Sequence, residues 1–262
     1  MSQKEANIAI RVDPTNPGQF FACCGLLELA HRLWAHAEGC FEEGRFLLGA
    51  TGADRKSLPG LLASLIKCDV AVASDTAASP KTEPLDVGSP IGMRLDWWLR
   101  DNGTPNLFKT WAANATSRQM LCKWRKPFEK NIKTFAAEPE NMLEVSERVQ
   151  GSYGFDSDLG WDALKVGFSL NEHAGLKDLP TRPAVELLGA IGLQRFFPIF
   201  NEKQQVVQYT TWRVPLMAPV ARLAAIGRLP SITVDRFRTR FVYRGSFKGL
   251  DTATIVQGES YE

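Results

Sequence analysis

The first long helix predicted in this chain comes from Asn16-Pro-Gly-Gln-Phe-Phe-Ala-Cys-Cys-Gly-Leu-Leu-Glu-Leu-Ala30. Asn16 has the side chain of a helix N-cap, Pro17 suits the first helical position, and Gln19 stands where a capping box has its reciprocal partner. The helix should run from about residue 20 to residue 37 and is apolar on nearly all sides through Leu33 and Trp34. Such a helix has no face for water, so the sequence predicts a buried helix.

Strands and helices are mixed around this helix without strict alternation. We expect strands at 6–12, 41–50, 69–74, 93–99, 204–214 and 231–243, and further helices at 58–67, 116–126, 139–149, 181–196 and 215–226. Pro127 should end or kink one of these helices, Thr181 should cap another, and residues 75–90 should form a loop or an irregular edge. The pattern predicts an α+β fold of mixed, mainly antiparallel sheets with packed helices.

The stretch Gly151–Gly160 is rich in Gly, Asp and Ser and reads as a connector. It is the predicted boundary between an N-terminal α+β half, residues 1–150, and a C-terminal α+β half, residues 151–262. One continuous domain is the alternative, since a chain of this length can form either.

The composition is that of a globular protein, with 44% hydrophobic and 23% charged residues. The net charge of +2 conceals a local asymmetry: residues 117–133 hold six bases against one acid, and residues 138–162 hold seven acids against one base. Five cysteines without paired spacing indicate a reducing compartment, with Cys23 and Cys24 packed as small hydrophobes. The N-terminus does not resemble a signal peptide and no apolar run reaches membrane-spanning length, so we expect a cytoplasmic protein without membrane contact.

Basic and aromatic residues alternate in Asp235-Arg-Phe-Arg-Thr-Arg-Phe-Val-Tyr-Arg-Gly-Ser-Phe-Lys-Gly249. An extended strand divides its side chains between two faces. Here one face would carry Arg236, Arg238 and Arg240, and the other Phe237, Thr239 and Phe241. The row of guanidiniums is either the solvated face of an ordinary sheet strand or a contact surface for phosphates, which suit the planar fork of arginine. Arg244 and Lys248 extend the charge past the strand and favour a polyanion.

A second basic segment, residues 117–133, interleaves Trp124 and Phe128 with its cations. This mixture can stack bases while holding phosphates. The alternative is an amphipathic helix with a solvated basic face. The candidate contact residues of this segment are Lys123, Arg125, Lys126 and Lys130, and Lys109 with Trp111 forms a third candidate.

Motifs of the familiar nucleotide-binding and hydrolytic sites are absent from the sequence. The three histidines, His31, His36 and His173, form no metal-ligand cluster, and no metal or cofactor is expected. His173, which follows a glutamate, is the one candidate general base.

Several segments, in this order, resemble the third protein of the Csb series of type I-U (I-G) CRISPR systems. They are Asn16–Ala30, Arg94–Trp98, Lys109–Ala112, Trp161–Ser169, Arg182–Phe196, Tyr209–Leu216 and the arginine strand, so the resemblance spans roughly residues 7 to 250. In the family pattern Lys-Thr-Trp-Ala is followed by Gly-Gln-Gln, whereas this chain has Ala113, Asn114 and Ala115.

The resemblance implies a non-catalytic subunit of an RNA-guided, Cascade-type interference complex, similar in role to the large subunit. Such subunits help to recognise a short flanking motif on duplex DNA, start strand separation and dock the helicase-nuclease, while the guide reads the sequence by base pairing. The implied partners are guide RNA, target DNA and other CRISPR-associated subunits: the backbone subunits, the repeat-processing subunit and the helicase-nuclease.

The predicted backbone contacts come from Arg236, Arg238, Arg240, Arg244 and Lys248, together with the second and third candidate segments. Reading a motif requires side chains such as Asn, Gln or Arg in a groove, and the candidates are Asn114, Gln119 and Asn171. Two alternatives remain open: a metal-independent RNA-processing endonuclease that uses His173, and a structural adaptor without nucleic-acid contacts.

Overall fold

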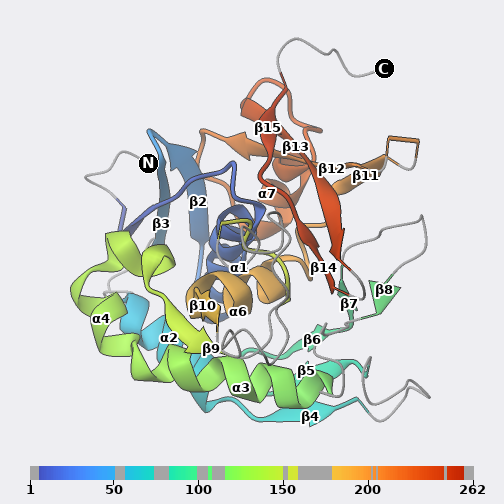
Figure 1. The fold of residues 1–262 in the computed structure, drawn as a ribbon. Helices are drawn as coiled ribbons and strands as arrows, with labels where there is room; N and C mark the ends of the chain where they lie inside the picture. Colours follow the sequence, from blue (N-terminus) through green and yellow to red (C-terminus); the bar gives the residue numbers. More distant parts are fainter. Residues whose placement is uncertain are drawn as a thin grey trace.

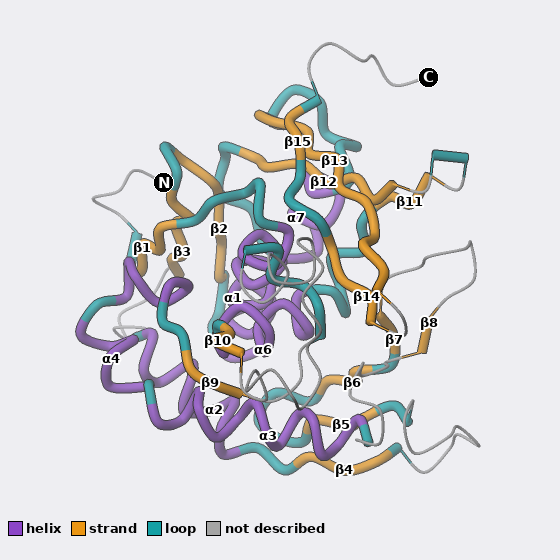
Figure 2. The backbone as a smooth tube through the Cα atoms, viewed as in Figure 1, coloured by secondary structure: helices purple, strands orange, loops and turns teal. Residues whose placement is uncertain are grey.

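The computed structural model of this protein describes residues 6–50, 57–73, 83–98, 106–107, 116–149, 153–158, 179–201, 203–204, 206–244 and 247–256. Its helices are α1 Pro17–Leu33, α2 Leu58–Lys67, α3 Ser117–Lys130, α4 Ile132–Ala137, α6 Pro183–Gly192 and α7 Ala218–Ala225, with a 3-10 helix η1 Pro139–Glu144. Helices lie in the centre and lower part of the view, and the larger sheets lie above them (Figures 1 and 2).

The strands are β1 Ile8–Arg11, β2 Ala37–Glu42, β3 Arg45–Ala50, β4 Val70–Val72, β5 Leu85–Val87, β6 Met93–Leu95, β7 Trp97–Trp98, β8 Asn106–Leu107, β9 Glu147–Val149, β10 Leu179–Thr181, β11 Ile199–Asn201, β12 Val206–Trp212, β13 Thr233–Arg244, β14 Phe247–Leu250 and β15 Thr254–Ile255. Every pairing between these described strands is antiparallel. The predicted α+β fold with mainly antiparallel sheets is therefore confirmed.

α1 begins at the predicted cap. Asn16 Oδ1 accepts hydrogen bonds from the backbone N–H groups of Gly18 (3.0 Å) and Gln19 (3.3 Å). The capping-box role of Gln19 is wrong, because its Oε1 accepts from the N–H of Asp13 (2.8 Å). Residues 17–30 are all buried, Cys23 and Cys24 among them, which confirms the buried helix. Its predicted end near Ala37 is wrong, because α1 ends at Leu33 and Ala37 begins β2.

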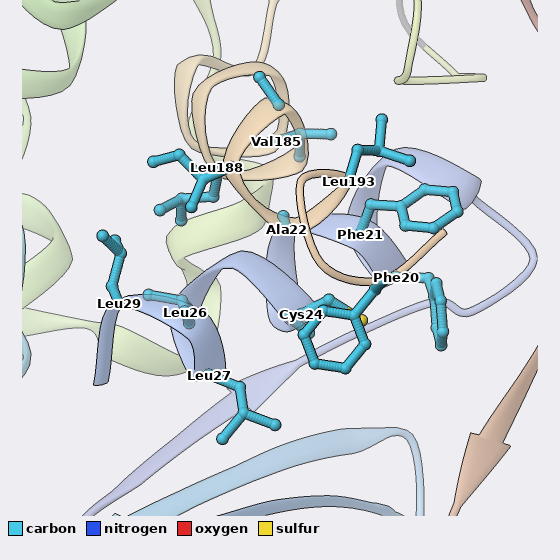
Figure 3. Close-up of a cluster of buried hydrophobic side chains, with 14 of the residues drawn as sticks. Phe20, Phe21, Ala22, Cys24, Leu26, Leu27, Leu29, Val185, Leu188 and Leu193 are labelled. Atoms are coloured by element: carbon cyan, nitrogen blue, oxygen red, sulfur yellow. The ribbon is translucent and has the colours of Figure 1, made fainter. Parts of the chain in front are cut away.

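α1 and α6 cross at the centre of the molecule, where glycines let the two backbones touch (Figures 1 and 3). A Cβ atom on Gly25 would lie 2.0 Å from the carbonyl oxygen of Leu188, and one on Gly192 would lie 2.1 Å from that of Phe21. Side chains from both helices form one hydrophobic cluster, labelled in Figure 3. The two predicted halves therefore share a core, and a domain boundary near residue 150 stays a prediction.

The N-terminal sheet has the strand order β1-β3-β2. Residues 41–50, predicted as one strand, instead contain the turn of the β2–β3 hairpin. Glu43 and Gly44 have φ values of +48° and +71°, the geometry of a two-residue turn whose twist matches the flanking strands. The turn was missed because Glu-Gly is not one of the Asn-Gly or Asp-Gly signals of such turns.

The C-terminal sheet has the order β11-β12-β13-β14, with β15 also paired to β13. β12 and β13 confirm the strands predicted at 204–214 and 231–243. Tyr209 of β12 stacks on Phe20 of α1 with 4.4 Å between ring centroids. Trp212, just beyond a register shift, is fully buried and donates its indole N–H to the carbonyl of Gly39 (2.8 Å). The sheet is thus attached to both α1 and the N-terminal sheet.

Three small sheets have the orders β4-β5-β6, β7-β8 and β10-β9. Residues 75–90 were predicted as a loop or an irregular edge, but they contain β5, the central strand of its sheet. Residues 93–99 contain two short strands rather than one. The acidic helix predicted at 139–149 is wrong: residues 139–144 form η1, and residues 147–149 form β9.

Pro127 does not end α3, which was one of the two outcomes predicted for it, because the helix continues through the proline to Lys130. Trp124 and Phe128, on either side of Pro127, are fully buried and hold the helix against the core. Thr181 does not cap α6; its hydroxyl donates to the carbonyl of Glu147 (3.3 Å), and the N-cap position belongs to Arg182.

The described part of the predicted connector, residues 153–158, packs inside the protein. Asp156 is buried, and its Oδ1 accepts from Asn16 Nδ2 (2.8 Å) and pairs with Arg182 Nη1 (3.3 Å). Burial raises the pKa of the Asp156 carboxyl, and the Arg182 guanidinium opposes that rise. The segment thereby ties the start of α1 to the start of α6. Within the described ranges, no helix has the length and apolar character needed to cross a bilayer.

Candidate nucleic-acid interface

β13 is the long strand of the C-terminal sheet, and its side chains alternate as predicted. Its core-facing residues are 2%, 3% and 8% exposed: Phe237, Thr239 and Phe241. On the other face, Arg236 and Arg238 are half-buried and Arg240 is exposed. The face that carries these three arginines is called the arginine face below. The three arginines lie on the side away from Phe237, Thr239 and Phe241 because successive side chains of a strand alternate between its two faces.

The core-facing side chains hold β13 in a fixed orientation. Phe237 stacks on Tyr209 with 5.3 Å between ring centroids, and Phe241 lies 6.1 Å from Phe200. The hydroxyl of Thr239 donates to the carbonyl of Asp251. Rotating the strand about its axis would break these contacts, so the three guanidiniums stay directed to the opposite side.

The arginine face lies beside polar and apolar residues of β12. In the register, Arg236 faces Thr210, Arg238 faces Gln208 and Arg240 faces Val206. Alternate residues of a strand are roughly 6.7 Å apart. At that separation two unit charges in a water-like medium repel by only about 0.6 kcal/mol. Repulsion along the row is therefore small at its exposed end, Arg240, whereas Arg236 and Arg238 are half-buried and have partners within the protein. A guanidinium is a planar fork that suits a phosphate, and the strand aligns three of them.

Positive charge is concentrated in the part of the chain that builds this sheet. Residues 193–256 contain ten Lys and Arg against three Asp and Glu, a net charge of +7, so the rest of the chain carries −5. Lys203, Arg222 and Arg228 are exposed cations of this region. Such a concentration attracts polyanions. The sequence reasoning missed it by comparing short runs, whereas a charge sum over a wider window reveals it.

The second basic segment, on α3, does not form the predicted base-stacking surface. Trp124 and Phe128 are fully buried, because they follow the inward-facing positions 117, 120 and 121 at helical spacing. Lys126 is exposed, but the guanidinium of Arg125 donates to the carbonyl of Cys68 (2.9 Å). The interpretation as an amphipathic helix with a basic outer face is the one that the structure bears out.

Lys130, the last basic residue of α3, pairs with the acidic segment that follows. Its ammonium lies 2.8 Å from Glu147 Oε1, which also accepts from Asn131 Nδ2 (3.0 Å). The hydrogen bonds from Lys130 and Asn131 lower the pKa of Glu147 below its ordinary value. This carboxylate therefore contributes stability above its ordinary pKa, and the contribution is lost as the pH falls through the lowered pKa.

We expect Glu147→Gln to remove this contribution. Because Lys130 is 70% exposed, the loss at neutral pH should be at most about 1 kcal/mol. Urea unfolding monitored by circular dichroism should show the difference from wild type at pH 7 and a smaller difference in acid, below the pKa range of glutamate. Glu129→Gln, at an exposed position of α3, is the control. A difference that grows on acidification would contradict the assignment.

The two basic segments do not form one surface. α3 packs against α6, α2 and α4. β13 instead pairs with β12, β14 and β15. Figure 1 shows α3 along the lower edge of the molecule and β13 in the sheet at the upper right. The arginine face and Lys123–Lys130 are therefore two separate basic surfaces of the described structure.

The remaining candidates divide into three groups. Gln119 is the N3 residue of a capping box on α3: its Oε1 accepts from the N–H of Thr116 (3.0 Å), so this acceptor is already used. The backbones of Arg244 and Lys248 belong to β13 and β14, and their side chains lie outside the described part. Outside the described residues altogether are Lys109, Trp111, Asn114, Asn171 and His173.

The depressions beside β13 in the described surface are small, and the larger of two, about 90 Å³, is lined by Val234 and Asp235 at the start of the strand rather than by its arginines. Beside Arg236, a cavity of about 10 Å³ lined by Gln208, Thr210 and Ile226 has room for roughly one water. A groove of about 530 Å³ lies at the β2–β3 turn, lined by Arg11 and Arg45 together with three acids. Its mixed charge does not suit a polyanion. No group of three His, Cys, Asp or Glu among the described residues could hold a metal ion.

Comparison of the chain with protein-family models, with curated protein sequences and with solved structures finds no match in any of the three. The resemblance to the Csb family therefore stays a prediction.

Proposed function

We propose that this protein is a non-catalytic, nucleic-acid-binding subunit of an RNA-guided interference complex, located in the cytoplasm, and that the arginine face holds a phosphate backbone. The observation that carries the proposal is the alignment of Arg236, Arg238 and Arg240 on one face of a strand whose other face is anchored in the core. The +7 charge of residues 193–256 supports it. The assignment to a Cascade-type complex, with guide RNA, target DNA and other subunits as partners, rests on the sequence resemblance.

A polyanion accounts for the arginine face better than a small anion does. The three arginines are spread along the strand rather than converging on one point, and the cavity beside Arg236 is about the size of a water molecule. A phosphate chain can engage the three forks in succession. Contacts of this kind do not depend on base sequence, so the arginine face would position nucleic acid rather than read a motif.

Replacing Arg236, Arg238 and Arg240 together with alanine is expected to weaken nucleic-acid binding about tenfold or more at low salt. Loss of three phosphate contacts should also reduce the slope of log K against log salt by about 2 to 3. The measurement is fluorescence anisotropy with labelled single-stranded RNA, single-stranded DNA and duplex DNA over a salt series. The three probes also show which nucleic acid is preferred.

The matched control removes three lysines from the other basic surface: Lys126→Ala, Lys130→Ala and Lys133→Ala. All three positions are exposed, and the change in net charge is the same. If this control lowers affinity and slope as much as the arginine variant does, the arginine face is not the binding site. Near-identical circular dichroism spectra would show that both variants are folded.

The proposed assembly has its own test. Co-expression with the genes that neighbour its own should yield a particle containing this protein and RNA, detected by absorbance at nucleic-acid wavelengths and by mass analysis. A particle that forms normally with the arginine variant and keeps its affinity for target DNA would favour the alternative of a structural adaptor. The endonuclease alternative depends on His173 and stays a prediction.

A further inference from the structure

α7 is apolar on its outer side as well as on its buried side. Its sequence is Ala218-Pro-Val-Ala-Arg-Leu-Ala-Ala225, in which Arg222 is the one polar residue. Four alanines face the protein, whereas Val220 and Leu223 are 38% and 43% exposed. A helix that is apolar all round is typical of a buried helix, yet one side of α7 lies at the surface.

Other exposed apolar side chains gather beside this helix. Seven large hydrophobic residues are exposed in the described part of the chain, and four of them fall within residues 214–223: Val214, Met217, Val220 and Leu223. The last three follow one another at a spacing of three residues and are therefore neighbours along the helix. Single exposed hydrophobic residues are ordinary, but a contiguous group of this kind marks an interaction site.

Two arginines lie beside the apolar group. Arg222 is exposed on α7 itself, with its guanidinium 5.1 Å from the centroid of the Phe197 ring. Residues 203–234 contain Lys203, Arg213, Arg222 and Arg228 and no Asp or Glu. The backbone N–H of Arg228 bonds to the carbonyl of Leu223 (2.9 Å), which places Arg228 beside the exposed leucine. An apolar centre with arginine around it is the composition of a protein–protein interface. The sign of the surrounding charge selects an acidic partner.

We propose that the outer face of α7 docks an acidic segment of a partner protein. This segment places apolar side chains on Val220 and Leu223 and carboxylates on Arg222 and Arg228. The surface goes beyond the proposed nucleic-acid binding, since a sugar-phosphate backbone would leave the apolar centre in water. A bilayer suits this face less well than a protein does, because α7 is only eight residues long and its alanine side is buried in the protein.

A peptide-display library sorted on the full chain tests the proposal. Short helical peptides are selected on the wild-type protein and counter-selected on Leu223→Asp. We expect the retained peptides to combine apolar residues at helical spacing with a net negative charge. Leu223→Asp should lower the affinity of the protein for these peptides about tenfold or more, because a buried carboxylate would replace the apolar contact. Val72→Asp is the matched control: Val72 is 37% exposed on β4, and its replacement should leave binding unchanged.

Reversing the charge of the two arginines separates the contribution of ion pairs to peptide binding from that of the apolar contacts. The double variant Arg222→Glu, Arg228→Glu should bind the selected peptides less tightly than wild type does. It should regain affinity for versions of the same peptides in which lysine replaces each acidic residue. The proposal is overturned if the selected peptides are basic, or if they bind Leu223→Asp as well as wild type. Two further results for Leu223→Asp would overturn it. If the variant abolishes a concentration-dependent dimer seen in sedimentation, the occupant is a second copy of the chain. If it abolishes binding to anionic vesicles, the occupant is a membrane.

Discussion

Replacing Gly25 by alanine is expected to destabilise the fold by at least about 3 kcal/mol, at the upper end of the cost of overpacking a core. In most helices the same substitution is stabilising, because alanine has the higher helix propensity. The sign reverses here because a Cβ on Gly25 would lie 2.0 Å from the carbonyl oxygen of Leu188. Ordinary contact begins at 3.4 Å, so α1 and α6 would have to separate by more than 1 Å.

Gly192→Ala should have a comparable effect, since its Cβ would meet the carbonyl oxygen of Phe21 at 2.1 Å and the amide nitrogen of Gly25 at 2.7 Å. One separation of the helices makes room for both added methyl groups. The double variant should therefore lose clearly less stability than the sum of the single variants.

Urea unfolding at neutral pH measures these differences. Gly60→Ala in the first turn of α2 is the control, because its nearest contact is the exposed side chain of Ser57 at 3.2 Å. This control should be neutral or slightly stabilising. An unfolding midpoint for Gly25→Ala equal to that of Gly60→Ala would show that the helices do not approach this closely.

Replacing Glu28 by glutamine is expected to cost about 2–3 kcal/mol, the second large effect. Glu28 of α1 is 1% exposed and lies between two arginines. Arg32 Nε is 2.6 Å from Oε1, Arg195 Nη2 is 3.1 Å from the same oxygen, and Arg195 Nε bonds to Oε2. Removing one member of a buried ion cluster leaves uncompensated charge and typically costs about 3–5 kcal/mol. The two arginines are 26% and 27% exposed, so water recovers part of this loss.

Glu28→Gln should also loosen segments of the protein that are far from Glu28 in the sequence. Arg32 also donates to the carbonyl of Ile91 (3.2 Å), and Arg195 lies just after α6, so the cluster joins α1 to α6 and to the loop before β6. Hydrogen exchange should show faster opening at both places in Glu28→Gln. Glu129→Gln, an exposed glutamate, should stay within about 0.5 kcal/mol of wild type. Equal unfolding midpoints for the two variants would contradict the structural role of Glu28.

Both predictions bear on the candidate interface. Phe20 of α1 stacks on Tyr209, and Tyr209 stacks on Phe237 of β13. A displacement of α1 is therefore transmitted to the strand that carries the arginine face. Nucleic-acid affinity should therefore fall together with stability in Gly25→Ala, whereas the arginine variant should lose affinity with its fold intact.

The sequence predicted correctly how the side chains of β13 divide between its two faces. Alternation over residues 236–241 was enough to separate the arginines from the aromatic residues, because a strand with one buried face has a strict period of two. On α3 the sequence left two alternatives open, a base-stacking surface and an amphipathic helix with a basic outer face, and the structure has the second. Helical spacing with Met120 and Leu121 would have placed Trp124 on the inner side.

The amino-acid sequence by itself determined the local features: the Asn16 cap, the buried character of α1, the span of α2 and the two faces of β13. These depend on neighbours within a few residues, through side-chain capping and periodicity. Tertiary structure alone decided the glycine crossing of α1 with α6, the role of Asp156 between two helix starts, and the distance between the two basic segments. Each of these depends on residues far apart in the chain, and only long-range packing brings such residues together or keeps them apart.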